Sequence, residues 1–398
     1  MGESETPARA RPKWSTYAIG ALFWLPLLSG IVSRLAKNKE WFADYGAIAC
    51  AAEKMLAGLP FYSRNLECPG VVVSGYVYHP ALAELFTWPL SVMGQANMRL
   101  AYAALFIACV GILIWIMVGR KAGGPRTQRN WFAAFIVGSA VYWGNIAVVI
   151  HALIGFCALV LRKRPSLLVL AIAAAAIVKP LFVTFGAVFV LARWPLWRRI
   201  AYGLATLGLA LGPTVWFALY GGALAEQWRE LVSYYVYIDR PGEAFLGWVE
   251  LFGGEVTSTA AAIGYVAFAA LMLIAALAIA EGLALDDESR ALLGLSVGVI
   301  LIPRLMGPDF WLLGPGLVAM AGALSAVNAA RGRLLERALL AICVVALIGN
   351  MADLADYTTK LAVLAFAVLV LITAVIVAQE RKLSPSVLWR RIWTGAAG

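Results

Sequence analysis

Residues 171–191 read AIAAAAIVKPLFVTFGAVFVL, an apolar segment whose single charged residue, Lys179, is followed by Pro180. A helix needs roughly 20 apolar residues to cross the hydrocarbon core of a bilayer, and similar apolar runs recur along this chain. The runs are continuous, whereas a transmembrane β-barrel shows alternating segments about ten residues long. The segment therefore predicts a helical membrane protein that carries a charge where charge is costly.

The composition of the whole chain leads to the same class. Of its 398 residues, 62% are hydrophobic and 14% are charged, and the mean hydropathy is +0.83. A soluble domain is about a quarter charged, so a water-soluble fold is excluded. We expect an all-α polytopic membrane protein, with residues 1–398 forming a single domain of about 11–13 transmembrane helices.

The net charge of +10 is concentrated in clusters between the apolar runs. Such clusters are typical of cytoplasmic loops under the positive-inside rule, and they favour contact with anionic membrane lipids. Because no base-reading module accompanies them, nucleic acid is not an expected partner. The clusters are Arg9/Arg11/Lys13, Arg120/Lys121/Arg126/Arg129, Arg162/Lys163/Arg164, Arg193/Arg198/Arg199, Arg331/Arg333/Arg337 and Arg381/Lys382/Arg390/Arg391.

If the basic clusters lie on the cytoplasmic side of the membrane, the apolar runs give an expected topology. The first apolar run reads as a retained helix over about 15–34, because it lacks a small-residue cleavage site. Two long outer loops follow at 35–80, with short interfacial helices, and at 221–257. Residues 81–94 are too short to cross comfortably and contain Pro89, so they form either a re-entrant segment or one thin crossing before 97–119. The predicted number of transmembrane helices therefore differs by one between these two alternatives.

Two hairpins are expected to point their tips outward. The first consists of 131–143 and 146–161, with Gly144-Asn145 at its tip; the second consists of 166–178 and 181–192, with Lys179-Pro180 at its tip. The remaining predicted helices are 200–220, 258–281, 290–302, 311–329, 337–350 and 361–378.

The cysteines and histidines show no metal-ligand spacing. Cys50 and Cys68 share one polar loop and could form a disulfide if that loop faces an oxidising compartment, so both the bonded and the free states stay open. The two histidines, His79 and His151, lie far apart in the sequence.

Four ionisable residues of the expected outer face are candidates for chemistry. Asp44 lies beside aromatic residues at the membrane boundary, where partial desolvation makes a carboxylate a better proton acceptor; it could also be a solvated loop acid. Lys179 at membrane depth is usually retained for an anion, although it could extend to the headgroups. His79 could bind a phosphate or a sugar, or be structural. Arg304 matches phosphate oxygens well, but it could simply pair with Asp309.

The order of these features resembles glycosyltransferase family 87, the polyprenol-phosphate-mannose-dependent transferases of the GT-C superfamily. The resemblance covers about residues 15–330, and its strength lies in the succession of loose motifs. In order, these are Asp44-Tyr45, Gly58-Leu59-Pro60-Phe61-Tyr62, Tyr78-His79-Pro80-Ala81-Leu82, Pro89-Leu90, Gly144-Asn145, Lys179-Pro180, Arg193-Trp194 with Trp197-Arg198-Arg199, and Ile302-Pro303-Arg304 with Asp309-Phe310-Trp311.

The resemblance implies a mannosyltransferase-like, multi-pass enzyme of the bacterial cytoplasmic membrane, with its active site facing the periplasm. Its donor would be a polyprenyl-phosphate sugar and its acceptor a lipid or glycan; Asp44 would be the general base, with inversion. Lys179, Arg304 and His79 would bind the donor phosphate. We expect a monomer without an obligatory metal, although Mg²⁺ is not excluded. Substrate contacts are expected from Tyr45, Tyr62, Tyr78, Glu84, Asn145, Arg240 and Asp309.

Two departures from the family pattern concern the substrate. His79-Pro80-Ala81 stands in place of a double proline, and Asn145 stands where glutamine is common, so the sugar or the acceptor can differ from that of the family. The rival class is a lipid or small-anion transporter or flippase that uses Lys179 and Arg304 as its substrate site. No internal repeat is evident, which argues against transporters built from inverted repeats.

Overall fold

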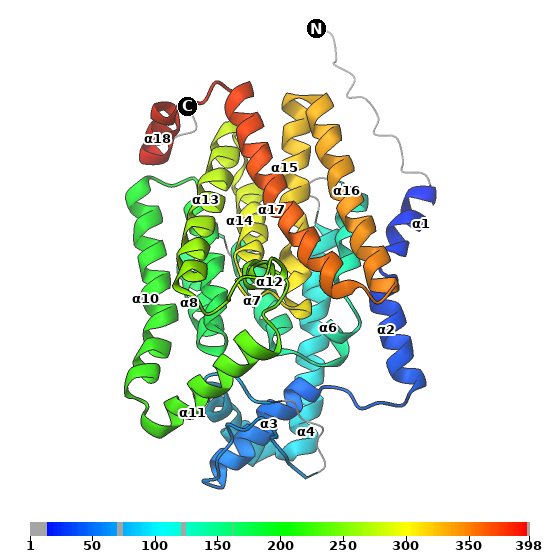
Figure 1. Ribbon diagram of the computed structural model, residues 1–398, viewed down its shortest axis with the longest axis vertical. Coiled ribbons are helices and arrows are strands. Elements are labelled where there is room, and N and C mark those ends of the chain that lie inside the picture. Colours follow the sequence, from blue (N-terminus) through cyan, green and yellow to red (C-terminus); the bar gives the residue numbers. More distant parts are fainter. Residues whose placement is uncertain (1–13, 70–74, 121–124, 161, 396–398) are drawn as a thin grey trace.

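The structure, a computed structural model, describes residues 14–69, 75–120, 125–160 and 162–395. The chain is 79% helical, and no strand occurs within these ranges. This confirms the all-α fold class, and the apolar helices described below are those of a polytopic membrane protein. Figure 1 shows most of the long helices running side by side along the longest axis of the molecule.

Six of the described helical segments are long and apolar enough to cross a bilayer. They are α4 (Pro80–Ile114) continued by η1 (Trp115–Gly119), α10 (Leu196–Tyr220), α13 (Thr259–Gly282), η5 (Gly307–Leu312) continued by α15 (Gly314–Val327), α16 (Ala329–Met351) and α17 (Ala355–Glu380). Shorter apolar helices are α2 (Leu25–Ala36), α7 (Ile146–Leu159), α8 (Pro165–Val178) and η3 (Pro180–Gly186) with α9 (Ala187–Leu191). By length and composition the structure therefore supports six spans, fewer than the 11–13 predicted.

The remaining elements comprise α14 (Asp287–Ile300), which lies inside the bundle, and shorter helices that connect or flank the long ones. The shorter helices are α1 (Trp14–Leu22), α3 (Ala43–Leu56), α5 (Arg126–Asn130), η2 (Trp131–Phe135), α6 (Ser139–Tyr142), α11 (Gly222–Ser233), η4 (Tyr234–Asp239), α12 (Phe245–Leu251) and α18 (Pro385–Thr394). In Figure 1, α3 and α11 lie at one end of the bundle and α18 lies at the other.

Burial separates the central helices from the peripheral ones. Every residue from Arg290 to Ile300 of α14 is buried, and 72% of the apolar window of α15 is buried. Only 17% of the corresponding window of α10 is buried, and its Leu204 and Trp216 side chains are largely exposed. Exposed apolar side chains on long helices fit a lipid environment, so α14 and α15 form the core of the bundle and α10 faces the lipid.

The two stretches expected at 81–94 and 97–119 both lie in α4, and a kink at Gly94, whose φ of 73° is not helical, divides α4 into two helical parts at the predicted place. Elsewhere the N-terminal third differs from the expected topology in two places. The single helix expected over 15–34 is two helices, because the chain restarts at Leu25 with a proline in the first turn of α2. The helix expected over 131–143 is broken into η2 and α6.

Within its described residues, 35–69 and 75–80, the first outer loop contains one helix, α3, where several short interfacial helices were expected. Nine residues of α3 are buried, and the helix packs against α4. Cys50 on α3 is bonded to Cys68, which ties the following loop to this helix. The structure thus forms the disulfide that the sequence left open, and it buries α3 where an amphipathic surface helix was expected.

Basic linkers gather at the end of the bundle that carries α18, which we call the basic end. Glu288 at the start of α14 accepts a hydrogen bond from Arg120 Nε (2.7 Å) and pairs with Arg162 (3.3 Å), so the linkers after η1 and α7 meet there. Glu281, Arg199 and Arg290 form a buried cluster nearby that joins α10, α13 and α14. Arg331, Arg333 and Arg337, expected in a loop, lie on the first turns of α16.

Candidate functional site

A cavity of about 1250 Å³ lies at the opposite end of the bundle, which we call the cavity end. Its walls come from α3, the segment before α4, the turn between α6 and α7, the junction of α8 with η3, the second outer loop and the turn before η5. Of the residues predicted for the site, the structure brings six to this cavity: Asp44, Tyr78, Asn145, Lys179, Arg240 and Arg304. Both predicted hairpin tips therefore converge on one site.

Asp44 is held by the turn between α6 and α7. The Asp44 N–H donates to Trp143 O (2.9 Å), and Asn145 Nδ2 donates to Asp44 Oδ2 (2.6 Å). Asn145 Oδ1 accepts a hydrogen bond from the Ala147 N–H (2.9 Å) and so caps α7. Because the amide oxygen is committed to the helix, the NH₂ group must point at the carboxylate, which fixes the orientation of Asp44.

The residue before Asn145 has to be glycine. Gly144 has a φ of 64°, and a Cβ there would lie 2.2 Å from Phe42 Cδ1. Phe42 itself is left-handed, with a φ of 65°, and its N–H donates to Tyr142 O (2.8 Å). A non-glycine residue in this conformation is costly and persists only where its surroundings impose it, so close packing of the two segments positions Asp44.

Lys179 lies where α8 ends, because Pro180 cannot continue the helix. Its Nζ pairs with Asp309 Oδ2 at 2.8 Å, and Asp309 Oδ1 lies 3.2 Å from His151 Nε2. Asp309 and His151 are fully buried, whereas the Lys179 side chain is 19% exposed. Asp309 is thus behind the cavity wall as the partner of Lys179, and it does not line the cavity or pair with Arg304, as the sequence had suggested.

Arg304 lines the cavity and also forms hydrogen bonds to the second outer loop. Its Nε donates to Arg240 O (2.8 Å) and its Nη2 donates to Tyr235 O (3.0 Å), which fastens the second outer loop to the turn before η5. A guanidinium has five N–H donors, so these two bonds leave it capacity to bind an anion. The same side chain therefore holds the second outer loop in place and contributes a positive charge to the cavity.

Four other predicted residues are placed elsewhere. His79 Nδ1 accepts a hydrogen bond from the Ala81 N–H (3.2 Å) and so caps α4, and burial lowers the pKa of His79. Tyr45 is buried against Tyr102, and burial raises its pKa to about 12. The Tyr62 hydroxyl donates to Tyr78 O (2.8 Å), and Glu84 is exposed on α4.

Three residues at or behind the cavity wall had no signal in the sequence. Arg64 lines the cavity with its guanidinium carbon 3.7 Å from the centre of the Tyr234 ring, and Glu67 lies in the same loop. His151 lies behind the wall beside Asp309, from which it is separated by 158 positions, and in the sequence it is an isolated histidine within an apolar run. Among the residues that the structure describes, four basic and two acidic ones line the cavity: Arg64, Lys179, Arg240, Arg304, Asp44 and Glu67. The excess of positive charge favours an anionic ligand.

Fold and site together define a helical membrane protein with a charged cavity at one end of its bundle. Comparison with protein-family models, with curated proteins and with solved structures gives no match to this chain. Among the described residues, no group of three or more His, Cys, Asp or Glu side chains lies close enough together to hold a metal ion.

Proposed function

We propose that the chain is a glycosyltransferase of the GT-C type that moves a sugar from a polyprenyl-phosphate donor to a lipid or glycan acceptor. The observation that carries the proposal is the convergence of Asp44, Lys179 and Arg304 on one cavity. These residues come from three distant segments, and the reaction needs one proton acceptor and cations for a phosphate leaving group. The shorter apolar helices would complete the bundle in this proposal.

The proposed reaction is a direct displacement at the anomeric carbon. The acceptor oxygen forms the new bond to this carbon from the face opposite the phosphate, while its proton passes to the Asp44 carboxylate. The bond between the anomeric carbon and the phosphate oxygen breaks, and the electron pair leaves with the phosphate, which results in inversion. The hydrogen bond from Asn145 keeps the Asp44 carboxylate in a fixed orientation for this transfer.

Lys179 and Arg304 would stabilise the charge that develops on the leaving phosphate. Asp309 partly neutralises Lys179, so Arg304 would contribute the less compensated charge and Lys179 a positioned donor. The cavity also has an apolar side formed by Leu246, Ala261, Ala262 and Tyr265. A polyprenyl tail could enter along that side, where apolar contact contributes about 0.8 kcal/mol per buried CH₂ group.

Two features support a location at the outer face of a bacterial cytoplasmic membrane. The Cys50–Cys68 disulfide lies at the cavity end, and structural disulfides persist in oxidising compartments. The basic linkers lie at the other end, as the positive-inside rule requires of a cytoplasmic face. In this orientation the cavity opens toward the periplasm.

The proposal is tested by incubating purified protein with polyprenyl-phosphate sugars and lipid acceptors and measuring sugar transfer. Asp44→Asn should lower kcat at least about 100-fold, since general-base catalysis contributes 10²–10⁴-fold. Glu53→Gln is the matched control, because it removes a carboxylate from the same helix that does not line the cavity. Full transfer activity in a folded Asp44→Asn variant would overturn the assignment of the base.

A second candidate function is proton-coupled transport of a lipid or small anion. The buried chain of Lys179, Asp309 and His151 favours it, because ionisable groups of this kind carry protons in transporters. Reconstituted vesicles distinguish the two functions. Movement of a labelled polyprenyl phosphate or anion across the bilayer, dependent on a pH gradient and without sugar transfer, would support transport and contradict the glycosyltransferase proposal.

A further inference from the structure

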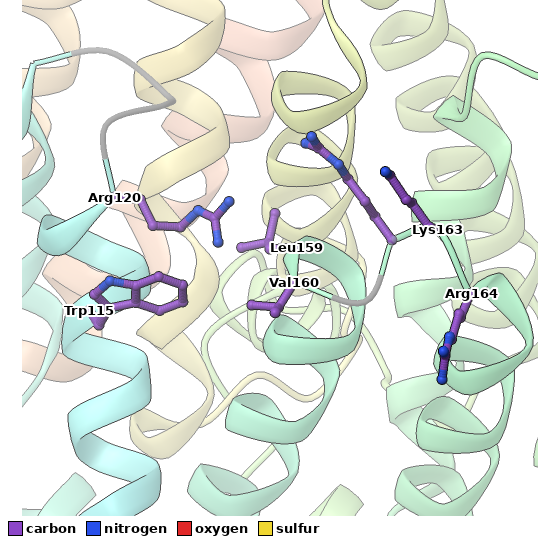
Figure 2. Close-up of a pocket in the computed structure, with 7 residues that line it drawn as sticks. Trp115, Arg120, Leu159, Val160, Lys163 and Arg164 are labelled. Atoms are coloured by element: carbon purple, nitrogen blue, oxygen red, sulfur yellow. The ribbon is translucent and has the colours of Figure 1, made fainter.

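A second cavity, of about 580 Å³, lies at the basic end, where η1 and α7 terminate. Its lining combines basic residues with apolar ones: Trp115, Arg120, Leu159, Val160, Arg162, Lys163 and Arg164. Figure 2 shows Arg120 on one side of the opening and Lys163 on the other, with Leu159 and Val160 between them and the Trp115 ring beneath Arg120. The cavity is separate from the candidate active site, which lies at the opposite end of α7.

The charge of this second cavity is only partly balanced. Glu288 pairs with both Arg120 and Arg162, and it holds the Arg120 guanidinium 4.9 Å from the centre of the Trp115 ring. Lys163 and Arg164 add two further positive charges to the lining, and both are exposed. Of the four basic residues that line this cavity, two pair with Glu288, and no ion pair of the described residues involves Lys163 or Arg164, which leaves positive charge for an anion.

The apolar part of the cavity lies at the level where a membrane span ends. Trp115 belongs to the last turns of the span Pro80–Gly119, and both Trp115 and Val160 are 42% exposed. Tryptophan is typical of the boundary between the hydrocarbon core and the headgroups. A ligand in this position meets cations on its polar side and apolar surface on its other side, which a free phosphate ion would not use.

We propose that this cavity binds an anionic phospholipid, with its headgroup phosphate on Lys163, Arg164 and Arg120 and the start of an acyl chain against Trp115 and Val160. Basic pockets between transmembrane helices on the cytoplasmic side are suited to anionic headgroups. The basic side chains would bind a phosphate group. The exposed apolar surface beside them favours a phosphate that belongs to a lipid over a free phosphate ion. The site does not depend on the proposed catalytic function.

Native mass spectrometry of the purified full chain tests the proposal. The probes are phosphatidylglycerol, phosphatidylcholine and inorganic phosphate, each titrated separately. We expect preferential retention of phosphatidylglycerol, and the double variant Lys163→Gln/Arg164→Gln should bind it about 30-fold more weakly, since each basic residue near the surface contributes about 1 kcal/mol. This variant leaves the Glu288 ion pairs intact.

The matched control is Arg333→Gln/Arg337→Gln, which removes two exposed positive charges from α16 without altering the cavity lining. It should bind phosphatidylglycerol as the unsubstituted protein does. Equal loss in the two double variants would mean diffuse attraction and would overturn the site, as would equal retention of phosphatidylglycerol and phosphatidylcholine. Inorganic phosphate that binds as tightly as phosphatidylglycerol would show a free-anion site and would overturn the lipid as the ligand.

A single variant keeps the test decisive if the double variant fails to fold. Trp115→Leu retains every charge but removes the aromatic surface, so it should weaken binding of phosphatidylglycerol severalfold. Unchanged lipid binding in this variant would contradict the assigned acyl contact.

Discussion

Asn145 and Asp44 are separated by 101 positions in the sequence, yet Asn145 Nδ2 lies 2.6 Å from Asp44 Oδ2. The same amide caps α7 through its oxygen. One side chain therefore links the start of a buried helix to the carboxylate that we assign as the general base.

Two substitutions of Asn145 should separate these roles. Asn145→Ser retains a good capping residue but cannot reach Asp44, so we expect transfer kcat to fall about tenfold or more with little change in melting temperature. Asn145→Ala should lose both, with a further destabilisation of about 1 kcal/mol. Kinetics and thermal unfolding in detergent measure the two effects. If Asn145→Ser retains full activity, the hydrogen bond has no role in positioning Asp44.

The ion pair of Lys179 with Asp309 should give strong coupling in a double-mutant cycle. Asp309→Asn alone leaves the ammonium group without its counterion at membrane depth, and we expect a destabilisation of about 3 kcal/mol. Lys179→Met/Asp309→Asn removes both charges and should recover more than half of that loss. The melting temperatures of the four proteins in one detergent provide the test. Additive effects would show that the two residues do not stabilise each other.

The buried cluster at the basic end should be essential for stability. Glu281 pairs with Arg290 at 2.7 Å and with Arg199 at 3.0 Å, and all three side chains are at most 4% exposed. Glu281→Gln leaves two buried guanidinium groups without a counterion, so we expect a loss of about 3–5 kcal/mol. Glu336→Gln on α16 is a control outside this cluster. Similar melting temperatures for both variants would contradict the prediction.

Glu243 in the second outer loop should make stability depend on pH. Burial, and then the nearby Asp356, raise the pKa of Glu243 to about 7. The folded protein therefore holds a proton that the unfolded chain releases above about pH 4.5, and stability should fall by up to about 3 kcal/mol as pH rises from 4.5 to 7. Melting temperature measured against pH shows this slope.

Glu243→Gln is the matched variant, because it keeps the neutral shape of the protonated side chain. Its melting temperature should exceed that of the unsubstituted protein above pH 7 and should lack this part of the slope. Parallel curves for the two proteins would assign the pH dependence to other groups.

The class of the protein was predictable because it depends on composition and local pattern. Continuous apolar runs require a membrane, and the proline of Lys179-Pro180 disfavours continuation of the helix before it. The helix boundaries were less predictable. The break at Gly94 in α4 was predicted, but the division of 131–143 into η2 and α6 was not, and burial of α3 depends on the surface of α4, which no local pattern reveals.

Some residues of the candidate site were likewise predictable from the sequence, and others were not. Residues that interrupt apolar runs, such as Lys179 and Arg304, were recognisable, because charge at membrane depth is conspicuous. His151 was not, since a histidine within an apolar helix acquires meaning only when Asp309 lies beside it. Conversely, His79 matched a motif but caps α4 in the structure.

That the chain is a helical membrane protein, and that a few of its ionisable residues are costly to bury, can be deduced from its amino-acid sequence, because both follow from the free energy of transferring single residues to lipid. Which charges meet depends on the packing of the helices. The pairing of Lys179 with Asp309 and of Asn145 with Asp44, and the placement of Glu84 away from the cavity, depend on contacts between distant segments. Such contacts are set by helix packing and not by any local pattern.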